Sequence, residues 1–463
     1  MFIKNGWRVG VVFALTVLLI ASCRKRDAML PDNYVVFESS SQGVAASENT
    51  VVVKVKAERG VTGDVPVIIN LTEQGVVYGT DYTTTPAATA GKISLTIPSG
   101  NSETSFTVTK VPGALFDGDE KLVSDIFSSG VPVLIGLTKK FTLNFGELVA
   151  SSATAIINGG GATYPNKVFI DLSANRQTPV LRTNWDLGFY SDANDFRVIL
   201  NSTTAMMAKQ IAKNDLNAVT AADTVGFGTE MLISSTAINP AALPYIDYPN
   251  GDLTRTAIAA TSANATDNKV YIINRGTGVG TPAPARGWKK IRIIRNATGG
   301  YTLQHADIAA TTFSSIDIPK DNNYFFKYVS FENGLVDVEP QKKKWDIAWT
   351  YFTNTFGSGA SEAPFMFQDI ILQNRNVEVA TVLVASKAFD VFGEADIASQ
   401  TFSSLQTKIG ADWRGTNPAA VKTDRYYIIK DGDNNYYKLR FTGMTDGGVR
   451  GYPSYQAVLV KKG

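Results

Sequence analysis

The chain has 463 residues, of which 44% are hydrophobic and 19% charged, with 44 Lys and Arg against 42 Asp and Glu. Removing an export signal that holds Lys4 and Arg8 would leave 42 basic residues against 42 acidic ones. The chain therefore lacks the basic excess of a general nucleic-acid or polyanion binder, and its length predicts roughly three domains of ordinary size.

Residues 1–22 have the pattern of an export signal, because Lys4 and Arg8 precede an apolar run, residues 9–20, that is too short for a transmembrane helix. The signal ends on Ala21 and Ser22, directly before Cys23, which is the single cysteine of the chain. Lipoprotein signal peptidase accepts small residues before a cysteine. We therefore expect Cys23 to be lipidated and to anchor the chain in outer-membrane lipid, on the periplasmic face or at the cell surface. Residues 23–33 would form the tether.

Residues 34–150 predict a β-sandwich, since short alternating runs are broken by Gly, Pro, Asn and Asp. The clearest strands are expected at 51–56, 65–71, 92–97 and 104–110. Gly79-Thr80-Asp81-Tyr82, then residues 95–100 and finally Asp117-Gly118-Asp119-Glu120 resemble the Calx-β domain in order and spacing. The resemblance implies an immunoglobulin-like sandwich.

Some Calx-β domains bind calcium through clustered acids, so the resemblance gives calcium as a candidate cofactor. Calcium needs six to eight oxygen ligands at one point, which the sequence does not show converging. The alternative is a spacer sandwich without metal. The candidate ligands are Glu48, Asp81, Asp117, Asp119 and Glu120.

The remaining chain looks duplicated, because Trp185-Asp186-Leu187-Gly188-Phe189 and Trp345-Asp346-Ile347-Ala348-Trp349 are variants of one phrase. Further strand-like segments repeat in the same order. We expect a Gly/Ser/Ala linker at 151–163, one copy at 164–320 and a second at 321–463. The fold class is all-β and mainly antiparallel, with minor helix at 205–216 and 394–409.

The two phrases are expected to be core strands. Side chains alternate along a strand, so Trp345, Ile347 and Trp349 should share one face, as should the equivalent residues of the first copy. Burying such rings stabilises a sheet, and we therefore interpret the tryptophans as structural markers of the repeat and not as binding sites. Asp186 and Asp346 should accept hydrogen bonds from backbone N–H groups.

The phrase Trp345-Asp346-Ile347-Ala348-Trp349, the strand 436–441 and the closing segment 447–455 resemble the HmuY family of lipid-anchored proteins from Bacteroidota. The match is weaker but ordered over 164–320. The resemblance implies β-rich, haem-binding lipoproteins that deliver haem to a TonB-dependent outer-membrane receptor and ligate iron with paired histidines or methionines.

This chain departs from the histidine pattern, because His305 is its single histidine. Methionine thioethers are soft ligands and are known as axial haem ligands. Met206 and Met366 each lie 21 residues after a phrase tryptophan, which suggests equivalent positions, although methionine also commonly fills gaps in a core. The candidate haem ligands are Met206, Met366, Met207, Met444 and His305.

The sequence favours a non-enzymatic envelope protein that captures haem or another porphyrin. The alternative is a surface adhesion or glycan-binding lipoprotein, which 18 tyrosines would suit. A third hypothesis, an envelope hydrolase, is unsupported: the chain has one histidine, no Gly-x-Ser-x-Gly phrase, and acids whose spatial pairing the sequence does not reveal.

Overall fold

The computed structural model describes residues 31–44, 48–112, 120–145, 152–233 and 238–463. Cys23, Asp117 and Asp119 lie outside the described residues. The chain divides into two compact units, the first drawn mainly from residues before 142 and the second mainly from residues 142–463. Both consist mainly of strands, and the short helical turns among the described residues lie in the second unit, which confirms the all-β expectation. Within the described residues, no helix is long and apolar enough to cross a membrane.

Residues 33–145 form two five-stranded sheets, with strand orders β5-β7-β3-β1-β9 and β2-β10-β8-β4-β6. The four strands expected from the sequence are all present. Apolar residues alternate along them, as in β3 and β6, and face a shared core. The strands are β1 (Asn33–Phe37), β2 (Ser41–Val44), β3 (Thr50–Ala57), β4 (Val65–Gln74), β5 (Tyr82–Thr85), β6 (Lys92–Ile97), β7 (Glu103–Lys110), β8 (Lys121–Ser129), β9 (Val133–Ile135) and β10 (Lys140–Phe145).

The second unit contains two five-stranded and two four-stranded sheets, and its strands occur twice in the same order. The first copy comprises β11 (Ser152–Ile156), β12 (Asn166–Asp171), β13 (Arg176–Leu181), β14 (Leu187–Tyr190), β15 (Val198–Leu200), β16 (Met207–Gln210), β17 (Val270–Asn274), β18 (Trp288–Arg295) and β19 (Tyr301–Ala306). The second comprises β20 (Ser314–Ile318), β21 (Phe326–Ser330), β22 (Gly334–Val336), β23 (Ile347–Phe356), β24 (Ala363–Gln373), β25 (Glu378–Leu383), β26 (Arg425–Lys430), β27 (Tyr436–Asp446) and β28 (Val449–Lys461).

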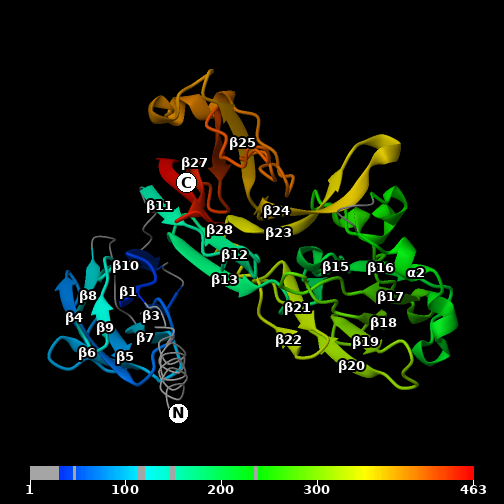
Figure 1. Ribbon diagram of the computed structural model, residues 1–463, viewed down its shortest axis with the longest axis horizontal. Coiled ribbons are helices and arrows are strands. Elements are labelled where there is room, and N and C mark those ends of the chain that lie inside the picture. The colour runs from blue at the N-terminus through cyan, green and yellow to red at the C-terminus, as the bar shows by residue number, and fades with distance from the viewer. Residues whose placement is uncertain (1–30, 45–47, 113–119, 146–151, 234–237) are drawn as a thin grey trace, which may run out of the picture. The chain divides into compact units, whose positions relative to one another are not determined.

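The two copies exchange their first three strands. The strand β12 pairs with β23 of the second copy, and β21 pairs with β14 of the first. The edge strands follow the same rule, because β11 joins β28 while β20 joins β19. Each compact module therefore contains strands of both copies. Module A consists of β14–β22, and module B consists of β11–β13 with β23–β28 (Figure 1).

Three local predictions were wrong. The expected linker at 151–163 contains β11, because Ala153 is buried and the strand completes the β28 edge. The expected helix at 205–216 is absent, and the segment instead contains the strand β16 with irregular chain on either side. At 394–409 one short 3₁₀ turn forms, residues Glu394–Ser399. The spacing of small and apolar residues in these segments is compatible with a helix, but pairing with neighbouring strands determines the conformation that they adopt.

Short helical turns connect the strands. The longest connection runs from β16 to β17 and carries the one α-helical turn among the described residues, α2 (Phe227–Glu230). The 3₁₀ turns are η1 (Ser202–Thr204), η2 (Leu216–Ala218), η3 (Ala221–Thr224), η4 (Pro240–Tyr245), η5 (Leu253–Arg255), η6 (Ala265–Asp267), η7 (Gly359–Ser361), η8 (Phe389–Val391) and η9 (Glu394–Ser399).

Candidate functional site

Each Trp-Asp phrase forms a buried corner at the start of a strand. In module A, the Asp186 carboxylate accepts the backbone N–H of Phe331 at 2.9 Å. The Asn201 side-chain amide donates to the Trp185 carbonyl at 2.7 Å. The first hydrogen bond fixes the end of the exchanged strand β21 to the corner, as expected for an aspartate that accepts backbone hydrogen bonds. The second fixes the turn that follows β15.

Module B repeats this corner. Asp346 accepts the backbone N–H of Leu172 at 2.7 Å, and the Asn374 amide donates to the Trp345 carbonyl at 2.9 Å. The tryptophans do not share a face with the residues two positions later. The ring of Trp345 packs edge-on against Phe169 in a different core cluster from Ile347 and Trp349. The strand begins only after the aspartate, so the alternation expected from the sequence does not extend to the tryptophan.

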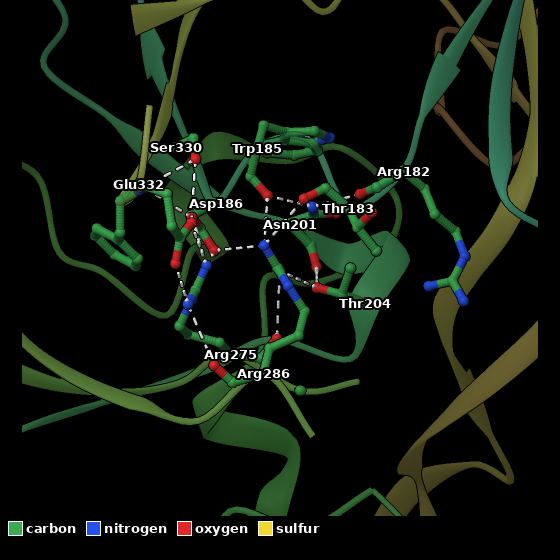
Figure 2. A network of polar contacts seen from close by, with 12 residues as sticks. Arg182, Thr183, Trp185, Asp186, Asn201, Thr204, Arg275, Arg286, Ser330 and Glu332 are labelled. Carbon is green, nitrogen blue, oxygen red and sulfur yellow. Dashed lines mark hydrogen bonds and ion pairs between the residues drawn. The ribbon is translucent and has the colours of Figure 1, made fainter. Parts of the chain in front are cut away.

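A network of ions surrounds the corner of module A (Figure 2). Arg275 donates to both carboxylate oxygens of Asp186 at 3.0 Å and to Glu332 at 2.6 and 2.8 Å. Arg286 lies 2.9 Å from the same Asp186 carboxylate. Burial works against the charge of both arginines, yet the two carboxylates raise the pKa of Arg275 above its ordinary value. The fully buried Asp186 is thus held between two cations.

The corner of module B has the opposite surroundings. Asp431 occupies the position of Arg275, because it follows Tyr427-Ile428-Ile429 as Arg275 follows Tyr271-Ile272-Ile273. Burial raises the pKa of Asp346 well above its ordinary value, and the nearby carboxylates of Asp171 and Asp431 raise it further. The second corner therefore favours a protonated carboxyl group.

The cavities of the second unit include a small one and a larger one. One of about 70 Å³ is lined by Lys167, Trp185 and Arg375 among others. It is smaller than sites for drug-sized ligands, which run from roughly 300 to 1,000 Å³. The other, of about 370 Å³, lies in module B beside η8.

The hairpin of β23 and β24 carries three aromatic side chains on one face. The rings of Phe356 and Phe365 lie 6.4 Å apart, and those of Phe365 and Phe367 lie 5.1 Å apart. Phe356 is 58% exposed. Met366 lies between two of these residues in sequence, and so it points to the opposite face of the hairpin. There its sulfur lies 3.0 Å from the Thr353 hydroxyl.

The calcium candidates do not converge within the residues that the structure describes. Glu48 lies 3.2 Å from Arg176 and 3.7 Å from Lys344, and Asp81 accepts the backbone N–H of Val77 in a turn. Glu120 starts the segment that leads into β8. No group of three or more His, Cys, Asp or Glu in the described ranges has the geometry of a metal site.

A family model described as HmuY protein matches residues 163–301 and again residues 322–456. The chain belongs to the HmuY family. The double match confirms the two tandem repeats predicted from the Trp-Asp phrases, and it places the chain in a family of haem-binding-like proteins of the cell envelope.

Several solved structures are similar to parts of this chain at low sequence identity. The apo form of the Calx CBD1 domain is 19% identical, with 25% of this chain and 96% of that chain covered and a TM-score of 0.22. A non-cellulosomal cohesin from Archaeoglobus fulgidus is 13% identical, with 25% and 91% covered and a TM-score of 0.17. A two-domain protein of unknown function from Bacteroides fragilis NCTC 9343 is 12% identical, with 45% and 75% covered and a TM-score of 0.18. No curated protein matches the chain.

The candidate haem ligands of this HmuY chain are not brought together as an axial pair. Met206, Met207 and Met444 lie in three different core clusters, each at most 6% exposed. His305 is 8% exposed beside the ring of Phe331, and burial lowers the pKa of its imidazole. Met366 is the one candidate that is partly exposed. The described residues therefore do not fit an iron centre with two protein ligands.

The proposed equivalence of Met206 and Met366 is wrong. The corner asparagine follows the phrase tryptophan by 16 residues in the first HmuY repeat and by 29 in the second, a difference of 13. The additional residues lengthen the β23–β24 hairpin. Strand register places Ala208 opposite Ile273 and Val379 opposite Ile429, so the equivalent of Met206 is Val377. Equal spacing from the tryptophan was coincidental.

Sequence reasoning missed the arginines that surround Asp186. A signal was available, because aligning the two Tyr-Ile-Ile segments places Arg275 against Asp431. Such a charge reversal at a repeated position indicates that the two corners differ. The contribution of Glu332 could not have been found in this way, because it reaches Arg275 only through strand exchange.

Proposed function

We propose that this chain is a non-enzymatic, lipid-anchored binding protein of the outer membrane that captures haem or another porphyrin. The double match to the HmuY family carries the proposal. Anchoring through Cys23 rests on the signal sequence, and delivery to a TonB-dependent receptor rests on the family resemblance. The protein would hold its ligand for transfer and carry out no chemistry on it.

The aromatic face of the β23–β24 hairpin is the best location for the porphyrin ring. Phe356, Phe365 and Phe367 offer an apolar aromatic surface there, with neighbouring rings inclined by 48° and 67°, and aromatic rings pack favourably against planar ligands. Met366 lies on the other face, and so contact with the ring itself would supply most of the binding energy. Iron would contribute little.

Titration with haemin and with metal-free protoporphyrin IX tests this mode of binding. We expect both compounds to bind, with affinities within about tenfold of each other, because the macrocycle and not the metal is recognised. The measurement is porphyrin absorbance, under oxidising and reducing conditions. Replacing Phe356 and Phe365 by alanine should weaken both affinities by about tenfold or more. Phe127→Ala is the matched control, because Phe127 is 59% exposed in the first unit.

Two results would reject the proposal. The first is the absence of binding by either porphyrin, and a positive glycan array would then support the glycan-binding alternative. The second is binding of haemin alone, with the spectrum of an iron that has two axial ligands. That result would mean that the candidate methionines or His305 ligate the iron, which would require them to leave their core positions.

A further inference from the structure

The cavity of about 370 Å³ in module B has the size of a small-molecule site. It lies where η8 and the segment before β26 approach the strand β27. Phe389, which is 5% exposed, forms an apolar wall on the same face of β27 as Arg440, whereas Phe441 lines the cavity from the opposite face of that strand. Arg425, Lys422 and Arg440 bring positive charge to the same cavity.

Two of these three cations are already neutralised. Arg425 donates to both oxygens of Asp412 at 2.7 Å and to Asp424 at 2.9 Å. Lys422 also lies 3.0 Å from Asp412. Their charges are therefore satisfied within the protein, and they leave Arg440 as the cation to consider.

Arg440 is held in place but not paired. Its Nε donates to the Gln456 side chain at 2.9 Å, and its guanidinium lies 4.3 Å from the centre of the Phe389 ring. Among the residues that the structure describes, its two terminal nitrogens have no hydrogen-bond or ion-pair partner. A guanidinium fixed by stacking, with two free parallel donors, matches the geometry of a carboxylate.

The first repeat shows what happens when the same arginine has only a structural role. Arg292 is the equivalent of Arg440, because Lys290 and Lys438 stand opposite Ile272 and Ile428 in the same register. Arg292 donates to the backbone carbonyls of Asn268 at 3.0 Å and Ala265 at 2.6 Å, beside η6. At this repeated position, Arg292 donates to backbone carbonyls in module A. In module B, the two terminal nitrogens of Arg440 have no partner among the described residues.

We propose that the module B cavity binds a small monocarboxylate with an apolar body, whose carboxylate pairs with Arg440 while its body lies against Phe389. Asp390 also lines the cavity and would repel a second negative charge. A monoanion is therefore preferred over phosphate or a dicarboxylate. This site is separate from the proposed porphyrin-binding face, and the two proposals do not depend on each other.

Calorimetric titration of the full mature chain with benzoate tests the site, with benzamide and inorganic phosphate as comparison compounds. We expect benzoate to bind with a dissociation constant below roughly 10 mM. Benzamide should bind about tenfold more weakly or worse, since it lacks the charge. Phosphate should not compete with benzoate.

Variants identify the residue responsible. Arg440→Gln should weaken benzoate binding by about tenfold or more, and Arg292→Gln should leave it unchanged. Ala388→Trp is a second variant, which fills the cavity and keeps the arginine, and it should also abolish binding.

The proposal is overturned if benzoate gives no saturable heat at roughly 10 mM. It is also overturned if benzamide binds equally well, if Arg440→Gln binds as the unmodified chain does, or if Arg292→Gln loses as much affinity. Competition by phosphate would identify a general anion site in its place. Haemin is not used in these titrations, so failure here and failure of the porphyrin proposal are distinguishable.

Discussion

One aspartate at one backbone corner meets opposite charges in the two modules. Asp186 lies between Arg275 and Arg286, whereas Asp346 lies near Asp171 and Asp431. The hydrogen bond to the exchanged strand is the same in both corners. Burial and the neighbouring carboxylates therefore oppose ionisation at the second corner by raising the pKa of Asp346, although the local fold of the two corners does not differ.

Replacing Asp346 by asparagine should change how stability depends on pH. The pKa of Asp346 is raised on folding, so the folded chain keeps a proton that the unfolded chain releases above its ordinary pKa of 3.8. The free energy of unfolding should therefore fall as pH rises above that value, until the raised pKa is passed. Asp346→Asn cannot ionise, and we expect a smaller loss of stability between about pH 5 and pH 8 in urea unfolding.

Asp186→Asn is the matched control at the equivalent corner. It leaves Arg275 and Arg286 without their buried carboxylate, and we expect a loss of about 3–5 kcal/mol in the free energy of unfolding. Equal effects of the two substitutions, or a steeper pH dependence for Asp346→Asn, would contradict the charge assignment at both corners.

At the scale of elements, the strands could be predicted from the sequence better than their partners. The alternating runs of the first unit gave β3, β4, β6 and β7 because one face of each is buried. The segment 152–156 could not be recognised, since its small side chains resemble a linker until β28 lies beside them. In the same way, the hairpin difference of 13 residues displaced Met366 from the position expected for it.

The edge strand β11 gives a test at this scale. We expect Ala153→Asp to lower the melting temperature of module B, because it places an unpaired charge at a buried position and costs about 1–3 kcal/mol or more. Thr154→Asp, one residue on, points to solvent and should change stability by less than about 0.5 kcal/mol. Calorimetric unfolding separates the two results. Equal melting temperatures would mean that residues 151–163 are the linker that the sequence suggested.

At the scale of the whole molecule, the repeat in the sequence and the module in space have different boundaries. The family match starts at residue 163, but β12 and β13 belong to module B. Module A runs without interruption from β14 to β22 and contains the complete Asp186 network. The duplication could be read from repeated phrases. The exchange could not, because equivalent strands have similar sequences and either pairing buries the same residues.

Fragments can distinguish the two boundaries. We expect a fragment of residues 184–338 to be more stable than one of residues 163–320, which lacks β21, β22 and Glu332. The expected difference is at least about 2 kcal/mol, measured by urea unfolding. A more stable 163–320 fragment would show that each repeat closes on itself.

The exchange also sets the order in which the chain can fold. Leu172 and its partner Asp346 are 174 residues apart. Because the chain is synthesised from its N-terminus, all of module A is made after β12 and before β23. At a synthesis rate of roughly 5–20 residues per second, β23 is made about 10–35 s after β12. During that time β13 borders the waiting hairpin, and its Pro179 removes one backbone donor from an edge on which a neighbouring chain could pair.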